Sequence, residues 1–122
     1  MGVTHKMSLR VTTVDRAKLS SVIRKNISSR IPGYLEVLEA HCRKMFGKSC
    51  IDLFFDEPES FRAVLFTRYN NDVNPVYFAI KYLFLRAILT ALDMLELEEE
   101  LARDFIENPL LFKEKFHKIL KI

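Results

Sequence analysis

One stretch of the chain, residues 76–94, limits the available folds more than any other feature. Only Lys81, Arg86 and Asp93 are charged within it, and almost all of its other positions are apolar or aromatic. A helix that is apolar on nearly every side must be surrounded, by lipid or by other helices. Its longest apolar run is far shorter than the roughly 18 to 20 residues of a membrane span, and two cations interrupt it. We therefore expect residues 75–94 to form the central helix of a bundle.

Composition agrees with a helical domain. The chain has 122 residues, three glycines and no tryptophan, which disfavours a sheet fold with many tight turns. This length is typical of one domain. We expect a flexible N-terminal segment over residues 1–13 and a single helical domain over residues 14–122. The start of the chain lacks the apolar core of a signal peptide, so we expect a cytoplasmic protein without a transmembrane segment.

Prolines and asparagines predict where helices begin, because proline is favoured at the first helical position and asparagine caps helix N-termini. The expected helices are 15–30, 32–46, 58–69, 75–94 and 109–121, and the first carries Asn26 on its apolar stripe. The segment with Leu97, Leu101 and Phe105 is either a fifth helix or a kinked extension of the fourth. Residues 50–55 are interpreted as a loop that buries apolar side chains. The fold class is an all-α compact bundle of five or six helices around residues 75–94.

The sequence contains no recognisable catalytic, cofactor or metal motif. Glu114 and His117 have the spacing used in di-metal bundles, but such sites need a second pair and further carboxylates. The three glycines form no phosphate-binding cluster. We therefore expect a non-enzymatic protein with no catalytic, cofactor-binding or metal-binding residues and no small-molecule substrate.

Lys81 and Arg86 interrupt the most apolar helix, and two interpretations remain open. Each cation can extend from a partly exposed edge, with its stem buried and its charged group in water. Alternatively, the two line a crevice for an anion or an acidic partner.

Basic residues elsewhere allow nucleic-acid binding, although the net charge is only +3. The candidate contacts are in the first two helices and just after them: Arg24, Lys25, Arg30, Arg43, Lys44 and Lys48. The lysines of the last helix could add to this basic surface.

The stretch Phe55-Asp56-Glu57-Pro58-Glu59-Ser60-Phe61-Arg62-Ala63-Val64-Leu65, followed by a long apolar helix, resembles the Nitrosopumilus-type output domain family of archaea. The resemblance covers about residues 35–92. It implies an archaeal, all-helical, non-enzymatic module with an output or sensing role in signalling. It assigns no site residues.

Together these observations predict a small interaction or regulatory module that acts through protein–protein contacts. Ten phenylalanines and the apolar central helix suggest more apolar surface than one small core can hide, which favours a homodimer. The alternative is a nucleic-acid-binding protein that uses the basic faces of the first, second and last helices.

Overall fold

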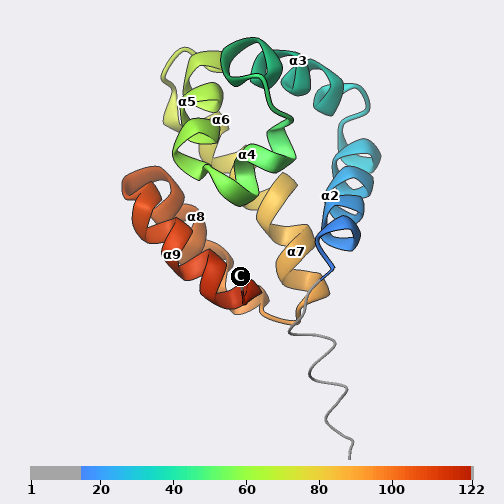
Figure 1. Cartoon of the computed structure of the whole chain (residues 1–122), viewed down its shortest axis with the longest axis vertical. Helices are drawn as coiled ribbons and strands as arrows, with labels where there is room; N and C mark the ends of the chain where they lie inside the picture. Colours follow the sequence, from blue (N-terminus) through green and yellow to red (C-terminus); the bar gives the residue numbers. More distant parts are fainter. Residues whose placement is uncertain (1–14, 122) are drawn as a thin grey trace, which may run out of the picture.

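The computed structural model describes residues 15–121, and the predicted flexible segment 1–13 lies outside the described residues. The described chain is helical throughout and contains no strand, which confirms the all-α class (Figure 1). Its elements are α2 (Arg16–Arg30), α3 (Tyr34–Phe46), α4 (Cys50–Asp56), α5 (Pro58–Arg68), α6 (Val73–Phe78), η1 (Ala79–Leu85), α7 (Arg86–Ala91), η2 (Leu95–Leu97), α8 (Glu98–Glu107) and α9 (Pro109–Leu120).

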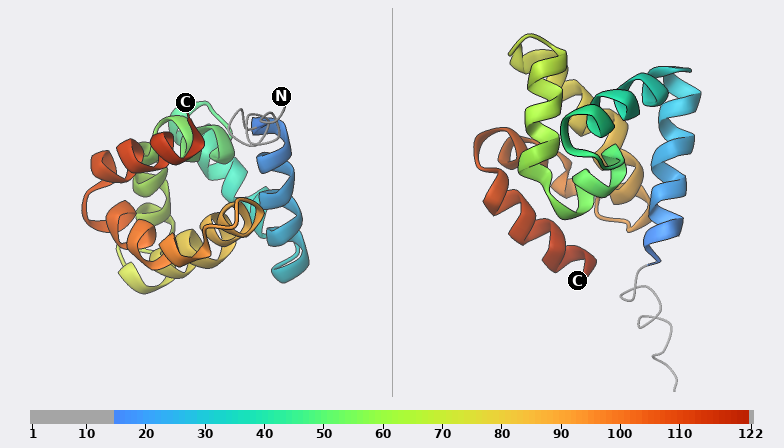
Figure 2. Two further views of the ribbon diagram at one scale, coloured as in Figure 1. Left: turned by 90° about the horizontal axis from the view of Figure 1, so that it is seen from below. Right: turned by 45° about the horizontal axis from the view of Figure 1, so that its top comes forward.

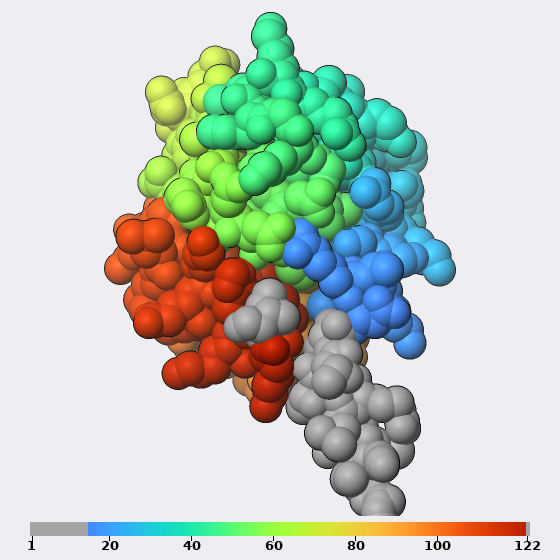
Figure 3. Space-filling model, in the orientation of Figure 1, coloured from blue at the N-terminus to red at the C-terminus, as the bar shows by residue number. Residues whose placement is uncertain are grey.

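The segments α6, η1 and α7 form one continuous helix through the middle of the bundle. Helix α2 packs along its η1 and α7 portions, and α8 packs against its α6 and η1 portions (Figure 2). Helix α3 lies across one end of the bundle, α4 packs between α3, α5 and α9, and α9 also lies against α8 (Figure 1). On the face shown in Figure 3, the start of α2 and the surface of α9 both border α4. No helix of the described chain is both long and apolar enough to cross a membrane.

Several expected helix boundaries are confirmed and others are wrong. Pro58 and Pro109 do open helices, and the Asn108 side chain caps α9 by accepting a hydrogen bond from a backbone N–H. Pro32 does not, because Gly33 adopts a left-handed conformation with φ of 85° and α3 begins only after it. The central helix begins at Val73, two residues before Pro75, and its cap is the Asp72 carboxylate.

The central helix also ends earlier than expected. It stops at Ala91, and Asp93 takes a positive φ of 57° that turns the chain away. The following segment is therefore a separate helix, α8, rather than a kinked extension. The exposed face of the central helix is also wider than expected, because Phe78 is 47% exposed.

Helix α4 occupies residues interpreted from the sequence as a loop. The Ser49 hydroxyl caps it by accepting the Asp52 N–H, which satisfies one of the unpaired donors of its first turn. The described bundle therefore contains one helix, α4, that the sequence did not predict. The burial expected for Ile51, Leu53 and Phe54 is confirmed.

Phe54 of α4 lies at the centre of an aromatic core. Its ring centroid is 5.0 to 6.1 Å from those of five other rings, contributed by α4, α5, η1 and α9: Phe55, Phe61, Phe84, Phe112 and Phe116. Seven of the ten phenylalanines are buried. One core thus buries most of the phenylalanine side chains on which the homodimer hypothesis rests. The homodimer stays a prediction.

Candidate functional site

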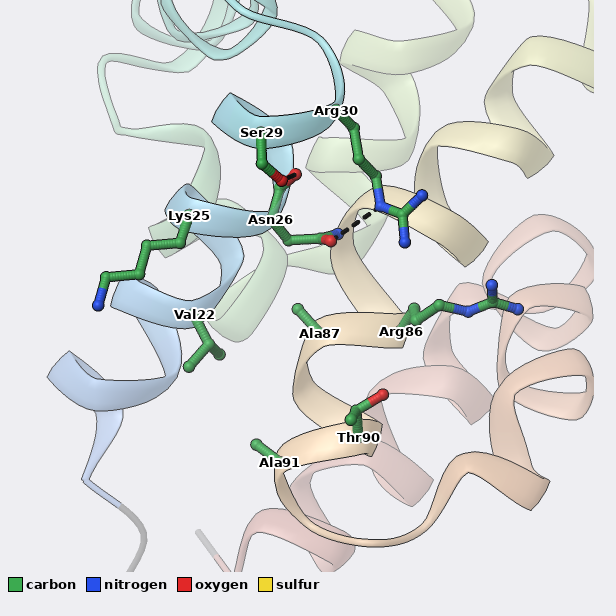
Figure 4. A pocket seen from close by; sticks show the side chains of 9 residues that line it. All are labelled: Val22, Lys25, Asn26, Ser29, Arg30, Arg86, Ala87, Thr90 and Ala91. Atoms are coloured by element: carbon green, nitrogen blue, oxygen red, sulfur yellow. Dashed lines mark hydrogen bonds between the residues drawn. The ribbon is translucent and has the colours of Figure 1, made fainter.

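An open groove lies between α2 and α7. Its volume is about 610 Å³, and one residue set lines it: Val22, Lys25, Asn26, Ser29, Arg30, Arg86, Ala87, Thr90 and Ala91 (Figure 4). No acidic side chain is in this lining. The groove is therefore a cationic site with an apolar and hydroxylic wall.

Small side chains explain why the groove exists. Both helices bury their inner faces completely, as Ile23, Ile27 and Ile88 show with exposed fractions of 0%. On the outward side, Ala87 and Ala91 stand one turn apart on α7 and fill little of the space toward α2. The two helices are thus held together by the core while their outer edges remain apart.

Asn26 joins the two walls of the groove through the backbone of the central helix. The segment η1 is a π-helix, so the Arg86 N–H bonds to the Lys81 carbonyl, five residues back. After Arg86 the backbone N–H groups again bond to carbonyls four residues back. The change of spacing leaves the Tyr82 carbonyl without a backbone N–H donor. The Asn26 side chain donates to that oxygen at 2.9 Å and to the Leu83 oxygen at 3.2 Å. Asn26 therefore satisfies the acceptor that the π-helix leaves unpaired.

The three cations of the groove differ in what they offer a ligand. Arg86 extends away from α2 (Figure 4), and its guanidinium donates two hydrogen bonds to Glu98, at 2.6 and 2.8 Å, which raises its pKa. Only its stem faces the groove. Arg30 bonds through Nε to the neutral Asn26 side chain, and Lys25 points outward. Neither Lys25 nor Arg30 has an acidic partner among residues 15–121, so their charges remain available.

An aromatic face adjoins the groove on the π-helical segment. The Arg86 guanidinium carbon lies 4.5 Å from the centroid of the Tyr82 ring, and the Phe78 ring is 5.2 Å from the same ring. The Lys81 ammonium lies 5.1 Å from Tyr82 and 5.4 Å from Tyr77. Lys81 is therefore not part of the groove lining. The Lys81 ammonium and the Arg86 guanidinium both contact the Tyr82 ring.

The predicted nucleic-acid contacts do not share one surface. Lys25 and Arg30 line the groove, but Arg24 pairs with Glu39 at 3.7 Å and Lys48 pairs with Glu57. The last two, Arg43 and Lys44, lie in the final turn of α3. That turn is roughly 20 Å from the start of α3, at about 1.5 Å per residue over its length. Of this set only Lys25 and Arg30 border the groove, and their side chains extend to opposite sides of α2 (Figure 4).

Other reactive side chains have structural roles. Cys42 and Cys50 are both buried, and their mutual contact together with burial raises the pKa of the Cys50 thiol. His117 bonds through Nε2 to the Phe55 carbonyl at 2.6 Å. Within residues 15–121, no three His, Cys, Asp or Glu side chains gather closely enough to hold a metal ion.

Two features of the site escaped the sequence-based interpretation. The exposure of Phe78 was missed because the central helix reads as apolar on all sides. The role of Asn26 was missed as well, although a polar residue on the apolar stripe of a helix is a usable signal. Comparisons with known protein families, with curated proteins and with solved structures find no match. The resemblance to the archaeal output domain family therefore stays a prediction.

Proposed function

We propose that this protein is a non-enzymatic binding module that recognises a negatively charged macromolecule through the α2–α7 groove. The observation that carries the proposal is that Lys25 and Arg30, two cations without acidic partners in the described chain, flank a groove that has no acidic lining. Arg86, the third cation of the lining, is by contrast paired with Glu98.

The chemistry of the lining supports binding rather than catalysis. Its polar members are two hydroxyls, one amide and three cations, and none is a base positioned beside a nucleophile. Arginine and lysine recognise carboxylates and phosphates by charge-assisted hydrogen bonds. The small side chains on α7 let a ligand approach the helix closely.

Two classes of partner meet this description: a protein with an acidic segment and a nucleic acid. The first agrees with the protein-contact and homodimer predictions and with the signalling role that the family resemblance implies. The second agrees with the alternative predicted from the basic residues. Both place a negatively charged group against Lys25 and Arg30.

The test is a comparison of two charge reversals that change the net charge equally. K25E/R30E alters the groove, and R43E/K44E alters exposed cations at the end of α3. Binding of fluorescein-labelled poly-L-glutamate and of a labelled single-stranded 20-mer DNA is measured by anisotropy at low salt. We expect at least one probe to bind the unaltered protein, and K25E/R30E to weaken that binding about tenfold or more, as loss of two charge-assisted contacts implies.

The control variant separates a site from a general charge effect. R43E/K44E should change the affinity less than twofold. Equal losses in the two variants would show that only net charge matters, and binding of neither probe would remove the basis for the proposal.

A further inference from the structure

We infer that the negatively charged partner is a single-stranded nucleic acid, whose phosphates contact the cationic groove and whose bases stack on the aromatic face of the π-helical segment. This inference rests on the proposed function and names the partner class for the same site. Its basis is the continuity between the groove and the exposed ring of Phe78.

The continuity follows from direct contacts. Asn26 lines the groove and holds the backbone carbonyl of Tyr82 at 2.9 Å. The stem of Arg86 borders the groove, and its guanidinium, on the side away from α2, lies 4.5 Å from the centre of the Tyr82 ring. The Phe78 ring packs against Tyr82 at 5.2 Å and is itself 47% exposed. The aromatic face therefore begins at the Arg86 edge of the groove, and a ligand that passes this edge meets Tyr82 and then Phe78.

The alternation of charge and ring along this path suits a polynucleotide. Lys81 lies within 5.4 Å of both tyrosine rings, so a cation accompanies the aromatic side chains. Each nucleotide presents an anionic phosphate and a flat base, and proteins bind single strands by combining basic grooves with aromatic stacking surfaces. A duplex keeps its bases stacked inside and has no ring to offer to Phe78. An acidic polypeptide supplies the charge but has no base to stack on the exposed ring.

The chain's own N-terminal residues are a poor occupant. Residues 1–14 include Lys6 and Arg10 and no acidic residue, so the cationic groove repels their charge. The path along the central helix from Phe78 to Arg86 rises roughly 12 Å, at about 1.5 Å per residue. This reach agrees with a site of a few nucleotides, near the lower end of the range of about 4 to 16 known for single-strand binding domains.

The experiment measures the salt dependence of binding, because charge contacts and stacking respond to salt differently. The probe is a fluorescein-labelled 20-mer of thymidylate, titrated at several sodium chloride concentrations. Removing two phosphate contacts with K25A/R30A should lower the slope of log affinity against log salt by about 1.4, at ~0.7 per phosphate for single strands. Replacing the exposed ring with F78A should weaken binding about tenfold at every salt concentration and leave the slope unchanged.

Matched variants keep the test specific. F46A removes a second exposed aromatic ring, 39% exposed at the end of α3, and should leave the affinity unchanged. F78W retains a stacking surface and should restore the affinity lost in F78A. Circular dichroism of each variant checks that it is folded.

The outcomes distinguish this inference from the proposed function. Binding that depends on Lys25 and Arg30 but not on Phe78, or duplex binding as tight as single-strand binding, overturns the stacking inference and leaves the groove in place. Poly-L-glutamate binding that exceeds that of the oligonucleotide, with the same dependence on Lys25 and Arg30, assigns the groove to an acidic protein. Failure of both probes overturns both proposals.

Discussion

At the scale of single residues, Arg86 has two neighbours that fix its role. Its guanidinium makes paired hydrogen bonds to Glu98, whose side chain is only 8% exposed, and it stacks on the Tyr82 ring. Glu98 is the one buried charged residue of the described chain. The pair therefore fastens the start of α8 to the central helix, and it compensates the charge that Arg86 would otherwise add to the groove.

We predict that R86M destabilises the protein more than E98Q/R86M does. The single substitution leaves the buried Glu98 carboxylate without its partner, which costs about 3 to 5 kcal/mol for a fully buried pair. Arg86 is 35% exposed, so we expect about 2 kcal/mol here, because water can reach the carboxylate. Urea unfolding followed by circular dichroism measures the difference.

The double variant provides the control, since a neutral Glu98→Gln side chain no longer needs a cation. It should recover about half of the lost free energy of unfolding, consistent with coupling between residues in contact. Strictly additive effects of the two substitutions would contradict the assigned pairing.

At the scale of elements, the π-helical segment depends on a side chain from another helix. The return from π to α pairing leaves the Tyr82 carbonyl without a backbone donor, and Asn26 of α2 supplies one. A buried acceptor without a partner costs about 1 to 3 kcal/mol. The geometry of the central helix is therefore set jointly by its own sequence and by α2.

We predict that N26A and N26D both destabilise the protein by about 1 to 3 kcal/mol, because neither an alanine nor an ionised aspartate at this position can donate to the Tyr82 carbonyl. Hydrogen exchange of the amides in η1 and α7 should accelerate in both variants. Asn74, exposed at the start of α6, is the matched control, and N74A should leave these exchange rates unchanged. Unaltered exchange in N26A would show that another donor satisfies the carbonyl.

The elements that the sequence predicts well are those with several turns and a capping signal. Helix α9 combines Pro109, an Asn108 cap and a long apolar stripe, and the observed helix agrees with the expected one. Helix α4 has seven residues, too few for a helical period to show, and every apolar side chain in it is buried. Its helical state depends on the Ser49 cap and on the surrounding aromatic core, which is tertiary information.

The candidate site was only partly predictable for a similar reason. The sequence singles out Lys25, Arg30 and Arg86 as cations, but places them in two different hypotheses, because their helices are more than 50 residues apart in the chain. Only the packing of α2 along α7 unites them. The π-helical segment after Phe78 has no local signal, since a run of apolar residues is equally compatible with an ordinary α-helix.

At the scale of the whole molecule, one arginine links α2 to α4, 40 residues later in the chain. Arg16 donates hydrogen bonds to Asp56 at 2.8 and 2.9 Å and to Asp52 at 2.9 Å, and its guanidinium carbon lies 4.8 Å from the Phe55 ring centroid. These contacts link the first described helix to α4. The second wall of the groove belongs to the central helix, so the position of α2 also decides the shape of the groove.

The link between α2 and α4 should make stability depend on pH in the acid range. The hydrogen bonds from Arg16 lower the pKa of Asp56, even though burial acts in the opposite direction. A carboxyl whose pKa is lowered by folding stabilises the protein above the unfolded value of about 3.9, and this contribution is lost as pH falls through the folded value. Because Asp56 is 50% exposed, we expect no more than about 1 kcal/mol from it.

We predict that R16M lowers the free energy of unfolding by about 1 kcal/mol at pH 7 and by progressively less as the pH falls through the lowered pKa of Asp56. Urea unfolding at a series of pH values down to pH 2 measures the two curves, which should converge as the pH falls below the unfolded value of about 3.9 and through the lowered pKa of Asp56. Any difference that persists at pH 2 measures the stacking of Arg16 on Phe55, which does not titrate.

The control is R103M, which replaces an exposed arginine of α8, and its curve should run parallel to that of the unaltered protein. Parallel curves for R16M as well would mean that α2 is held by its apolar contacts with the central helix alone, and that the shape of the groove does not depend on the charge of Asp56.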